Sequence, residues 1–179
     1  MRGWLLAVAI IAFASISSSS SASWIPARHA VSFDEREFAR YSASGSGTVE
    51  GQIVIRGEDD GQRHVGSGSD LTLLPVTPYT TEMVDREIRN GENLTSSDTR
   101  LRKYLRATKA DGNGSFTFRH VPSGEYYLTG LVSWYFGEDT YYQWACEKIT
   151  VREGQTVRLT ISRNVHRAGR PYVVFWRLE

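Results

Sequence analysis

The chain has 179 residues, 40% of them hydrophobic, and 21 lysines and arginines nearly balance 20 acidic residues, giving a formal net charge of +1. This length suits one domain of ordinary size. This charge balance argues against a dedicated nucleic-acid binder, because such proteins usually carry a strong excess of basic residues. The single cysteine, Cys146, excludes an intramolecular disulfide framework and any metal site built from several cysteines.

The first 22 residues have the pattern of a secretory signal. Arg2 precedes an apolar run over 4–13, and small residues surround Ala22, where a signal peptidase would cut. The run is shorter than the roughly 20 apolar residues that span a bilayer, and no later segment approaches that length. We therefore expect a cleaved signal peptide over 1–22, a mature chain with no transmembrane segment, and a periplasmic or secreted location.

A short helix is predicted over 32–41. Ser32 and Glu35 have the spacing of a capping box, and Phe38 and Tyr41 fall on one helix face. The Ser/Gly-rich composition of 42–47 is typical of a flexible linker. Residues 23–47 are therefore expected to form an N-terminal extension outside the main core.

From Thr48 onward the pattern changes to period two. Short alternating segments separated by turn residues are typical of an antiparallel sandwich or barrel, and they cover 51–56, 71–74, 115–119, 126–132, 148–151 and 156–161. The last two flank Glu153-Gly154-Gln155 and predict a hairpin with a short loop. A final strand is expected over 171–178.

An insertion at about 78–106 interrupts this pattern. Its first part, 78–97, is polar, and helical spacing predicts a short helix there through Met83, Val84, Glu87 and Ile88. The segment 101–105 fits either a continued helix or the start of the next strand. Long insertions between strands are often functional; the alternative is a lid packed over one open sheet face.

Two motifs in the middle of the chain resemble a known family. They are T-x-A-D-x-x-G-x-F-x-F at 108–118 and V-P-x-G-x-Y-x-L at 121–128, followed by V-R-E-G-Q-T-V-R-L-T at 151–160. Over about 48–162 the chain resembles the carboxypeptidase regulatory-like domains. The resemblance implies an antiparallel Greek-key β-sandwich of the transthyretin-like (prealbumin-like) type over 48–179. It implies little about function, because such domains are appended to many unrelated proteins.

The residues of these motifs agree with a sandwich. Asp111-Gly112 and Asn113-Gly114 supply the turn residues of a tight hairpin, and Phe116 and Phe118 share one face that can fill a core. Tyr126 lies near a corner, where its hydroxyl could bind a neighbouring backbone group. The apolar neighbours of Cys146 indicate that this thiol is buried.

No catalytic or metal-binding motif is found. The histidines are His29, His64, His120 and His166, and none begins a zinc-peptidase motif. The G-x-S-x-G signal of serine hydrolases is also missing. We expect no metal, no cofactor and no catalytic residues.

Aromatic residues gather around the polar segment 137–140. If that segment is a hairpin loop, alternate rings point to opposite faces of the sheet. Exposed rings beside carboxylates would suit sugar stacking or protein contact; the alternative is that the insertion covers the second face and buries them all. The candidate binding residues are Trp134, Tyr135, Tyr141, Tyr142 and Trp144.

These observations predict a non-catalytic exported module of the cell envelope, with a binding or structural accessory role and an envelope protein or glycan as partner. One alternative is a small hydrolase of transthyretin-like fold that uses histidines brought together in space. Convergence of two of His64, His120 and His166 with an arginine would favour the enzyme, and their separation would favour the module. A second alternative is a subunit that pairs its sheet edges with a partner. The oligomeric state is left open.

Overall fold

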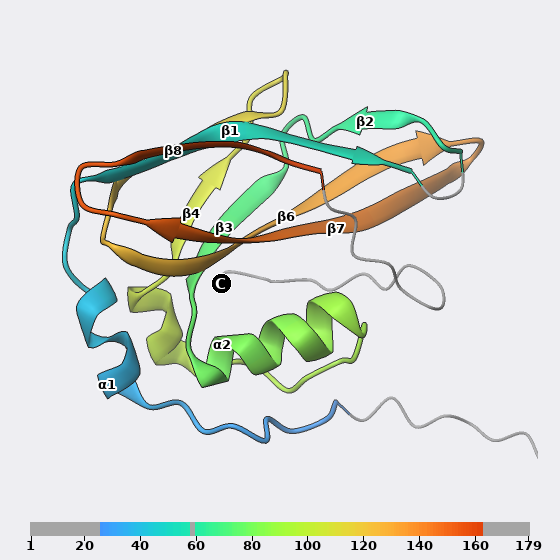
Figure 1. Cartoon of the computed structure of the whole chain (residues 1–179). Helices are drawn as coiled ribbons and strands as arrows, with labels where there is room; N and C mark the ends of the chain where they lie inside the picture. The colour runs from blue at the N-terminus through green and yellow to red at the C-terminus, as the bar shows by residue number, and fades with distance from the viewer. Residues whose placement is uncertain (1–25, 58–59, 163–179) are drawn as a thin grey trace, which may run out of the picture.

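The computed structural model describes residues 26–57 and 60–162, and within them two sheets pack face to face (Figure 1). In the first sheet β1 (Gly47–Arg56) pairs antiparallel with β2 (Arg63–Val65) and β5 (Ser115–Val121), and parallel with β8 (Thr156–Ile161). The second sheet is antiparallel, in the order β4 (Arg106–Lys109), β3 (Asp70–Pro75), β6 (Gly124–Phe136) and β7 (Asp139–Val151). The predicted β-sandwich is confirmed.

The predicted hairpin over 148–161 is wrong. The first of its two segments ends β7 and pairs with β6, whereas the second is β8 and pairs with β1 in the other sheet. Arg152–Gln155 therefore carry the chain across the sandwich. Alternation identifies both strands, and Gly154, at φ 65°, allows the chain to reverse direction between them. Neither feature determines with which strand β8 pairs.

The turn at 110–114 departs from prediction in the same way. Its chemistry is as expected: one Asp111 side-chain oxygen accepts hydrogen bonds from the amides of Asn113 and Ser115, both at 2.8 Å, and Gly114 has a φ of 73°. However, the turn joins β4 to β5, which belong to different sheets. It is a crossover between the sheets and not a hairpin.

The helix in the N-terminal segment is shorter than predicted, and the segment is more deeply buried. It forms α1 (Glu35–Phe38) and a 3-10 turn, η1 (Ala39–Tyr41), and the N-cap is Asp34 instead of Ser32. The expectation that it lies outside the core is wrong, because Phe38 and Tyr41 are fully buried in the main core. A flexible-looking linker after a helix therefore does not show that the helix is undocked.

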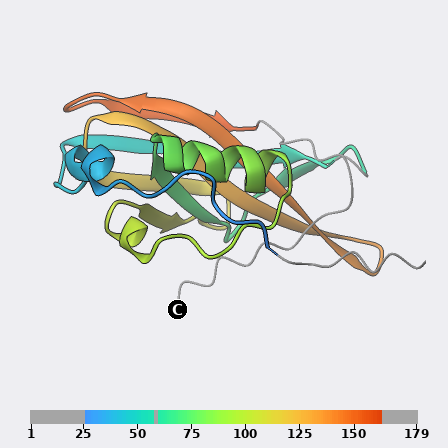
Figure 2. The ribbon, with the colours of Figure 1, turned by 90° about the horizontal axis from the view of Figure 1, so that it is seen from below.

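The insertion is helical, as predicted. It comprises α2 (Pro78–Met83), a π-helical continuation η2 (Val84–Arg89) and a 3-10 helix η3 (Thr99–Lys103). A capping box between Thr77 and Thr80 starts α2. Figure 2 shows α2 lying across the face of the second sheet. The ambiguous segment 101–105 contains the end of η3 and the approach to β4.

The inner faces of both sheets meet in one core. Phe116 and Phe118 are buried there, as predicted, and the Tyr126 hydroxyl donates to the Pro122 carbonyl at 2.8 Å, which confirms the expected corner contact. Cys146 is buried, as expected. Within the described residues no helix is both long and apolar enough to cross a membrane. The signal peptide over 1–22 and the strand over 171–178 lie outside the described residues.

Candidate binding groove

The β6–β7 hairpin sorts the aromatic residues onto two faces. Thirteen consecutive residue pairs, from Gly124–Val151 to Phe136–Asp139, keep one register without a bulge, and Gly137-Glu138 form the loop. Because directly opposed residues share a face, Trp134, Phe136 and Tyr141 lie on one side. Tyr135, Tyr142 and Trp144 lie on the other. The alternation predicted for a hairpin at this loop is confirmed.

The first group belongs to the inner face of the sandwich. Trp134 stacks on Tyr141 at 5.8 Å and on His64 at 4.5 Å between ring centroids, and Phe136 meets Tyr141 edge-on. The His64 ring is held in turn by the Asp60 carboxylate, 2.9 Å from its Nε2. Two of the five candidate residues, Trp134 and Tyr141, thus extend the core and do not face the insertion.

A groove of about 730 Å³ lies between the outer face of the second sheet and the insertion. The strands supply its floor, chiefly through Thr72, Leu74, Ala107, Thr129, Leu131, Ser133, Tyr142 and Trp144. The insertion supplies the opposite wall, through Met83, Ile88, Leu101 and Arg102. The groove therefore depends on where the insertion docks, and the alternation of the strands does not predict that position.

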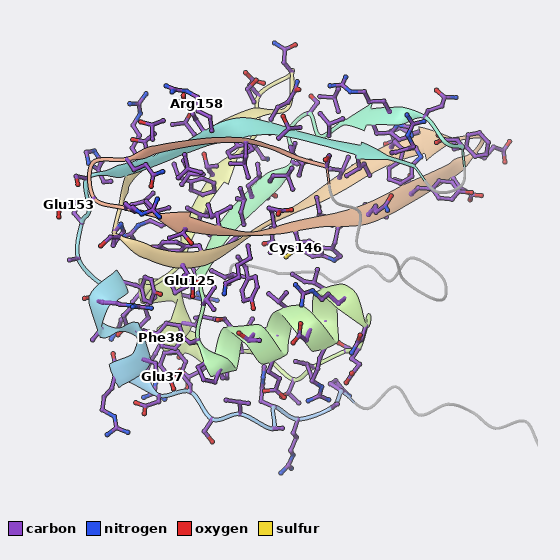
Figure 3. All side chains as sticks on the ribbon, viewed as in Figure 1. Glu37, Phe38, Glu125, Cys146, Glu153 and Arg158 are labelled. Carbon is purple, nitrogen blue, oxygen red and sulfur yellow. The ribbon has the colours of Figure 1, made fainter. Side chains whose placement is uncertain are left out.

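One end of the groove is apolar and closed. Trp144 packs there with Leu74, Tyr127 and Cys146 against Val84 and Ile88 of η2, in a second buried cluster separate from the main core. Figure 3 shows Cys146 on the side of β7 that faces the helix. Trp144 is only 9% exposed. For this residue, burial by the insertion is the correct alternative.

The other end of the groove is polar and open. Ser133 is directly opposite Tyr142 in the hairpin, and both line the groove near Asp70 of β3. The Asp70 carboxylate lies 3.7 Å from the Lys109 ammonium, and both side chains are largely exposed. Tyr142 is half-buried, so one face of the hairpin passes gradually from a buried indole to a partly open phenol.

The wall of the groove is fixed by a carboxylate on its far side. Glu82 of α2 accepts hydrogen bonds from the amides of Ala30 and Val31 at 2.7 and 3.0 Å, and from Arg86 at 2.8 Å. Burial acts to raise the pKa of Glu82, but these backbone and side-chain donors prevail and lower it to about 2. These hydrogen bonds tie the N-terminal segment to the insertion, and both ribbon views show that segment running beside α2 (Figures 1 and 2).

A second carboxyl in the insertion behaves in the opposite way. Glu87 is buried, and this burial raises its pKa to about 7, although the Arg86 charge acts against the shift. The proximity of Glu82 contributes a further rise. At neutral pH Glu82 is therefore firmly ionised, whereas Glu87 is close to its titration point.

His64 and His120 do not converge. His64 is paired with Ile55 of β1, and His120 precedes Val121, which is paired with Gly47 at the other end of that strand. Eight residues of extended strand correspond to about 26 Å. His166 lies outside the described residues, and within the described ranges no three His, Cys, Asp or Glu side chains form a candidate metal site.

Sequence reasoning missed the rest of the groove. Leu131 and Ser133 share the face of Tyr142 by simple alternation, so their position was readable once the hairpin loop was placed. Asp70 and Thr72 reach the groove only through the pairing of β3 with β6, and Met83 and Ile88 only through the docking of the insertion. No local pattern encodes these long-range arrangements.

No protein-family model matches the chain, and no curated protein matches it significantly. Among solved structures, PA1324 from Pseudomonas aeruginosa, described as a "putative carbohydrate binding protein", superposes with a TM-score of 0.65 at 23% identity, over 74% of this chain and 99% of that one. The major pilin subunit of Bacillus cereus gives a TM-score of 0.40 at 17% identity, over 68% and 30% of the two chains. The minor pilin of Streptococcus agalactiae gives 0.36 at 17% identity, over 75% and 49%. The similarity to PA1324 establishes a shared β-sandwich fold.

Proposed function

We propose that this protein is a non-catalytic carbohydrate-binding module of the cell envelope and that the groove is its binding site. The observation that carries the proposal is that the floor of the groove places Trp144 and Tyr142 beside the hydroxyls of Ser133 and Thr129. Aromatic rings and a few placed polar groups are the usual composition of a small-molecule site.

The chemistry of this floor matches that of a sugar. A pyranose ring has an apolar C–H face, which an aromatic ring can contact, and a rim of hydroxyls that need hydrogen-bonding partners. Ser133 and the Asp70 carboxylate supply such partners at the open end, and Thr129, opposite the buried Cys146, lies toward the closed end. The indole of Trp144 lines the groove at the closed end, and its Nε1 donor is buried with no hydrogen-bond partner among the described residues.

Two further points support the proposal. PA1324, described as a "putative carbohydrate binding protein", shares this fold over nearly its whole length. The apolar run and small residues before Ser23 support export to the compartment where envelope glycans are found. The mass of the protein recovered from its native source tests the second point, since cleavage after Ala22 should remove the first 22 residues.

The hydrolase alternative receives no support from the geometry. His64 is engaged by Asp60 and stacked on Trp134, on the inner side of the sandwich. His120 is about 26 Å away along β1. General acid–base chemistry needs the reacting groups within hydrogen-bond reach of one substrate atom, and these two residues cannot share one.

Two neighbouring tyrosines provide a matched test. Tyr142 faces the groove, whereas Tyr141 faces the core, and both are half-buried. The purified protein is screened on an array of oligosaccharides, and the best series is titrated by calorimetry. Tyr142→Ala should weaken binding by about tenfold, or about 1.4 kcal/mol. Tyr141→Ala should lower the thermal midpoint and leave affinity unchanged. A wild-type protein that binds no glycan, or a Tyr142→Ala variant of full affinity, contradicts the proposal.

A further inference from the structure

Resting on the proposed function, we infer that the ligand is an extended oligosaccharide that lies along the outer face of the β6–β7 hairpin. Its terminal sugar occupies the groove at Trp144, and the sugars that follow leave the groove over Tyr142 and then Tyr135. Tyr135 is therefore an outer subsite, beyond the groove itself, and it gives the protein a preference for longer chains.

The unbroken register of the hairpin sets these three rings in line. Leu131 is opposite Trp144, Ser133 is opposite Tyr142, and Tyr135 is opposite Thr140, so successive rows lie two residues apart on one face. Two residues of antiparallel strand span about 6.7 Å, which places the Tyr135 row about 13 Å from the Trp144 row. An aromatic ring thus stands in each of three consecutive rows.

Exposure increases along this line. Trp144 is 9% exposed and Tyr135 is 82% exposed, with the half-buried Tyr142 between them. Only a ligand that enters at the open end and extends outward along the hairpin can contact all three rings. The closed apolar end, formed by Leu74 and Ile88, prevents a chain from continuing past Trp144.

The outer row is exposed in the part of the chain that the structure describes. Among the described residues Tyr135 makes no ring contact, and its cross-strand neighbour Thr140 is small and exposed. Phe136, the next residue, is the other large hydrophobic side chain that is exposed within 26–57 and 60–162, but it lies on the opposite face, where its ring meets Tyr141. A lone exposed aromatic is ordinary on a protein surface; the position of Tyr135 in line with the groove makes it a subsite.

The test measures affinity against chain length for the purified protein, with the glycan series selected on the array supplied from monosaccharide to hexasaccharide. Wild-type affinity should rise with length up to about the trisaccharide, because each row of the hairpin adds one ring contact. Tyr135→Ala should lower the affinity for the trisaccharide and longer chains about tenfold and leave the monosaccharide affinity unchanged. Phe136→Ala is the matched control on the opposite face and should leave the whole length profile unchanged.

The outcomes separate this inference from the function on which it rests. Equal affinities for Tyr135→Ala and the wild type at every length, in a protein that Tyr142→Ala still impairs, overturn the outer subsite and leave the proposed function standing. A Tyr135→Ala variant that weakens the monosaccharide as much as the hexasaccharide overturns it too. A wild-type protein that binds no member of any series contradicts the proposed function and, with it, this inference.

Discussion

The outer faces of the two sheets differ in what they require from the rest of the chain. The first sheet presents polar side chains from β1, β5 and β8, among them Glu50, Thr117 and Arg158. The second sheet presents Leu74 and Trp144 on its outer face, in addition to the apolar residues that it sends into the core. The outer face of the first sheet can therefore face water, whereas the apolar outer face of the second sheet must be covered by the insertion. The groove forms where the insertion no longer covers that face.

Truncating a side chain of the insertion that covers the second sheet should have the largest effect on the free energy of unfolding. Ile88→Ala deletes a buried side chain of η2 that packs on the outer face of the second sheet, and such a truncation costs about 2–5 kcal/mol. Urea denaturation should show this loss in the free energy of unfolding. Thr117→Ala, an exposed position on the first sheet, should stay within about 0.5 kcal/mol. Equal losses at both positions would show that the two faces do not differ.

The buried carboxyl of Glu87, in the insertion, should make the stability of the protein depend on pH. Folding raises the pKa of Glu87 from 4.5 to about 7, so the folded protein binds more protons than the unfolded one between these values. Stability should therefore fall as the pH rises from about 4.5 to 7, by up to about 3 kcal/mol. Glu87→Gln should abolish this decline and be the more stable form at pH 8.

Glu82 provides the internal control for that measurement. Its lowered pKa has the opposite sign: its contribution is present above about pH 4.5 and is lost as the pH falls toward 2. The Glu87→Gln variant should keep this acid-side loss. A variant that also keeps the full decline between pH 4.5 and 7 would show that another group causes it.

A smaller effect is expected inside the sandwich. Tyr126→Phe removes the hydroxyl that donates to the Pro122 carbonyl, and loss of one such hydrogen bond costs about 1 kcal/mol, with somewhat more if the carbonyl is left unsatisfied. Chemical denaturation measures it. Since this contact belongs to the core and not to the cover, glycan affinity should be unchanged. A combined loss of stability and affinity would mean that the corner supports the groove.

The smallest effect is expected on the uncovered face. Arg158 pairs with Glu50 at 2.6 Å across β8 and β1, but the arginine is 75% exposed, and pairs of this kind contribute about 0–1 kcal/mol. Arg158→Ala should change the free energy of unfolding by less than about 0.5 kcal/mol in moderate salt. A loss comparable to that of Ile88→Ala would contradict the division between the two faces.

The sequence predicted the individual strands and turns better than it predicted which strands pair. Period-two alternation placed the strands, and the residues at 137–140 placed the hairpin that presents Tyr135 and Tyr142. The same kind of pattern misassigned Glu153–Gln155 as a hairpin, because turn chemistry specifies a reversal and not the sheet that the next strand joins. The groove combines β3, β6, β7 and the insertion, so it arises from contacts between segments far apart in the chain.

The candidate site shows the same limit. All five aromatic residues lie on the predicted hairpin, yet Trp134 and Tyr141 face the core and the other three face outward. Alternation divided them correctly but did not say which face the insertion would cover. That choice depends on Leu74 and Tyr127, which join Trp144 in an apolar surface only after β3, β6 and β7 have paired.

The parallel pairing of β8 with β1 has a consequence for how the protein folds. Thr48 pairs with Thr156, so the first sheet closes only through contacts between segments more than a hundred residues apart. Contacts of such long range slow folding, because the chain must lose loop entropy before they form. The first sheet cannot be completed until residue 161 has left the ribosome, because Ile161 is the last residue of β8 that pairs with β1.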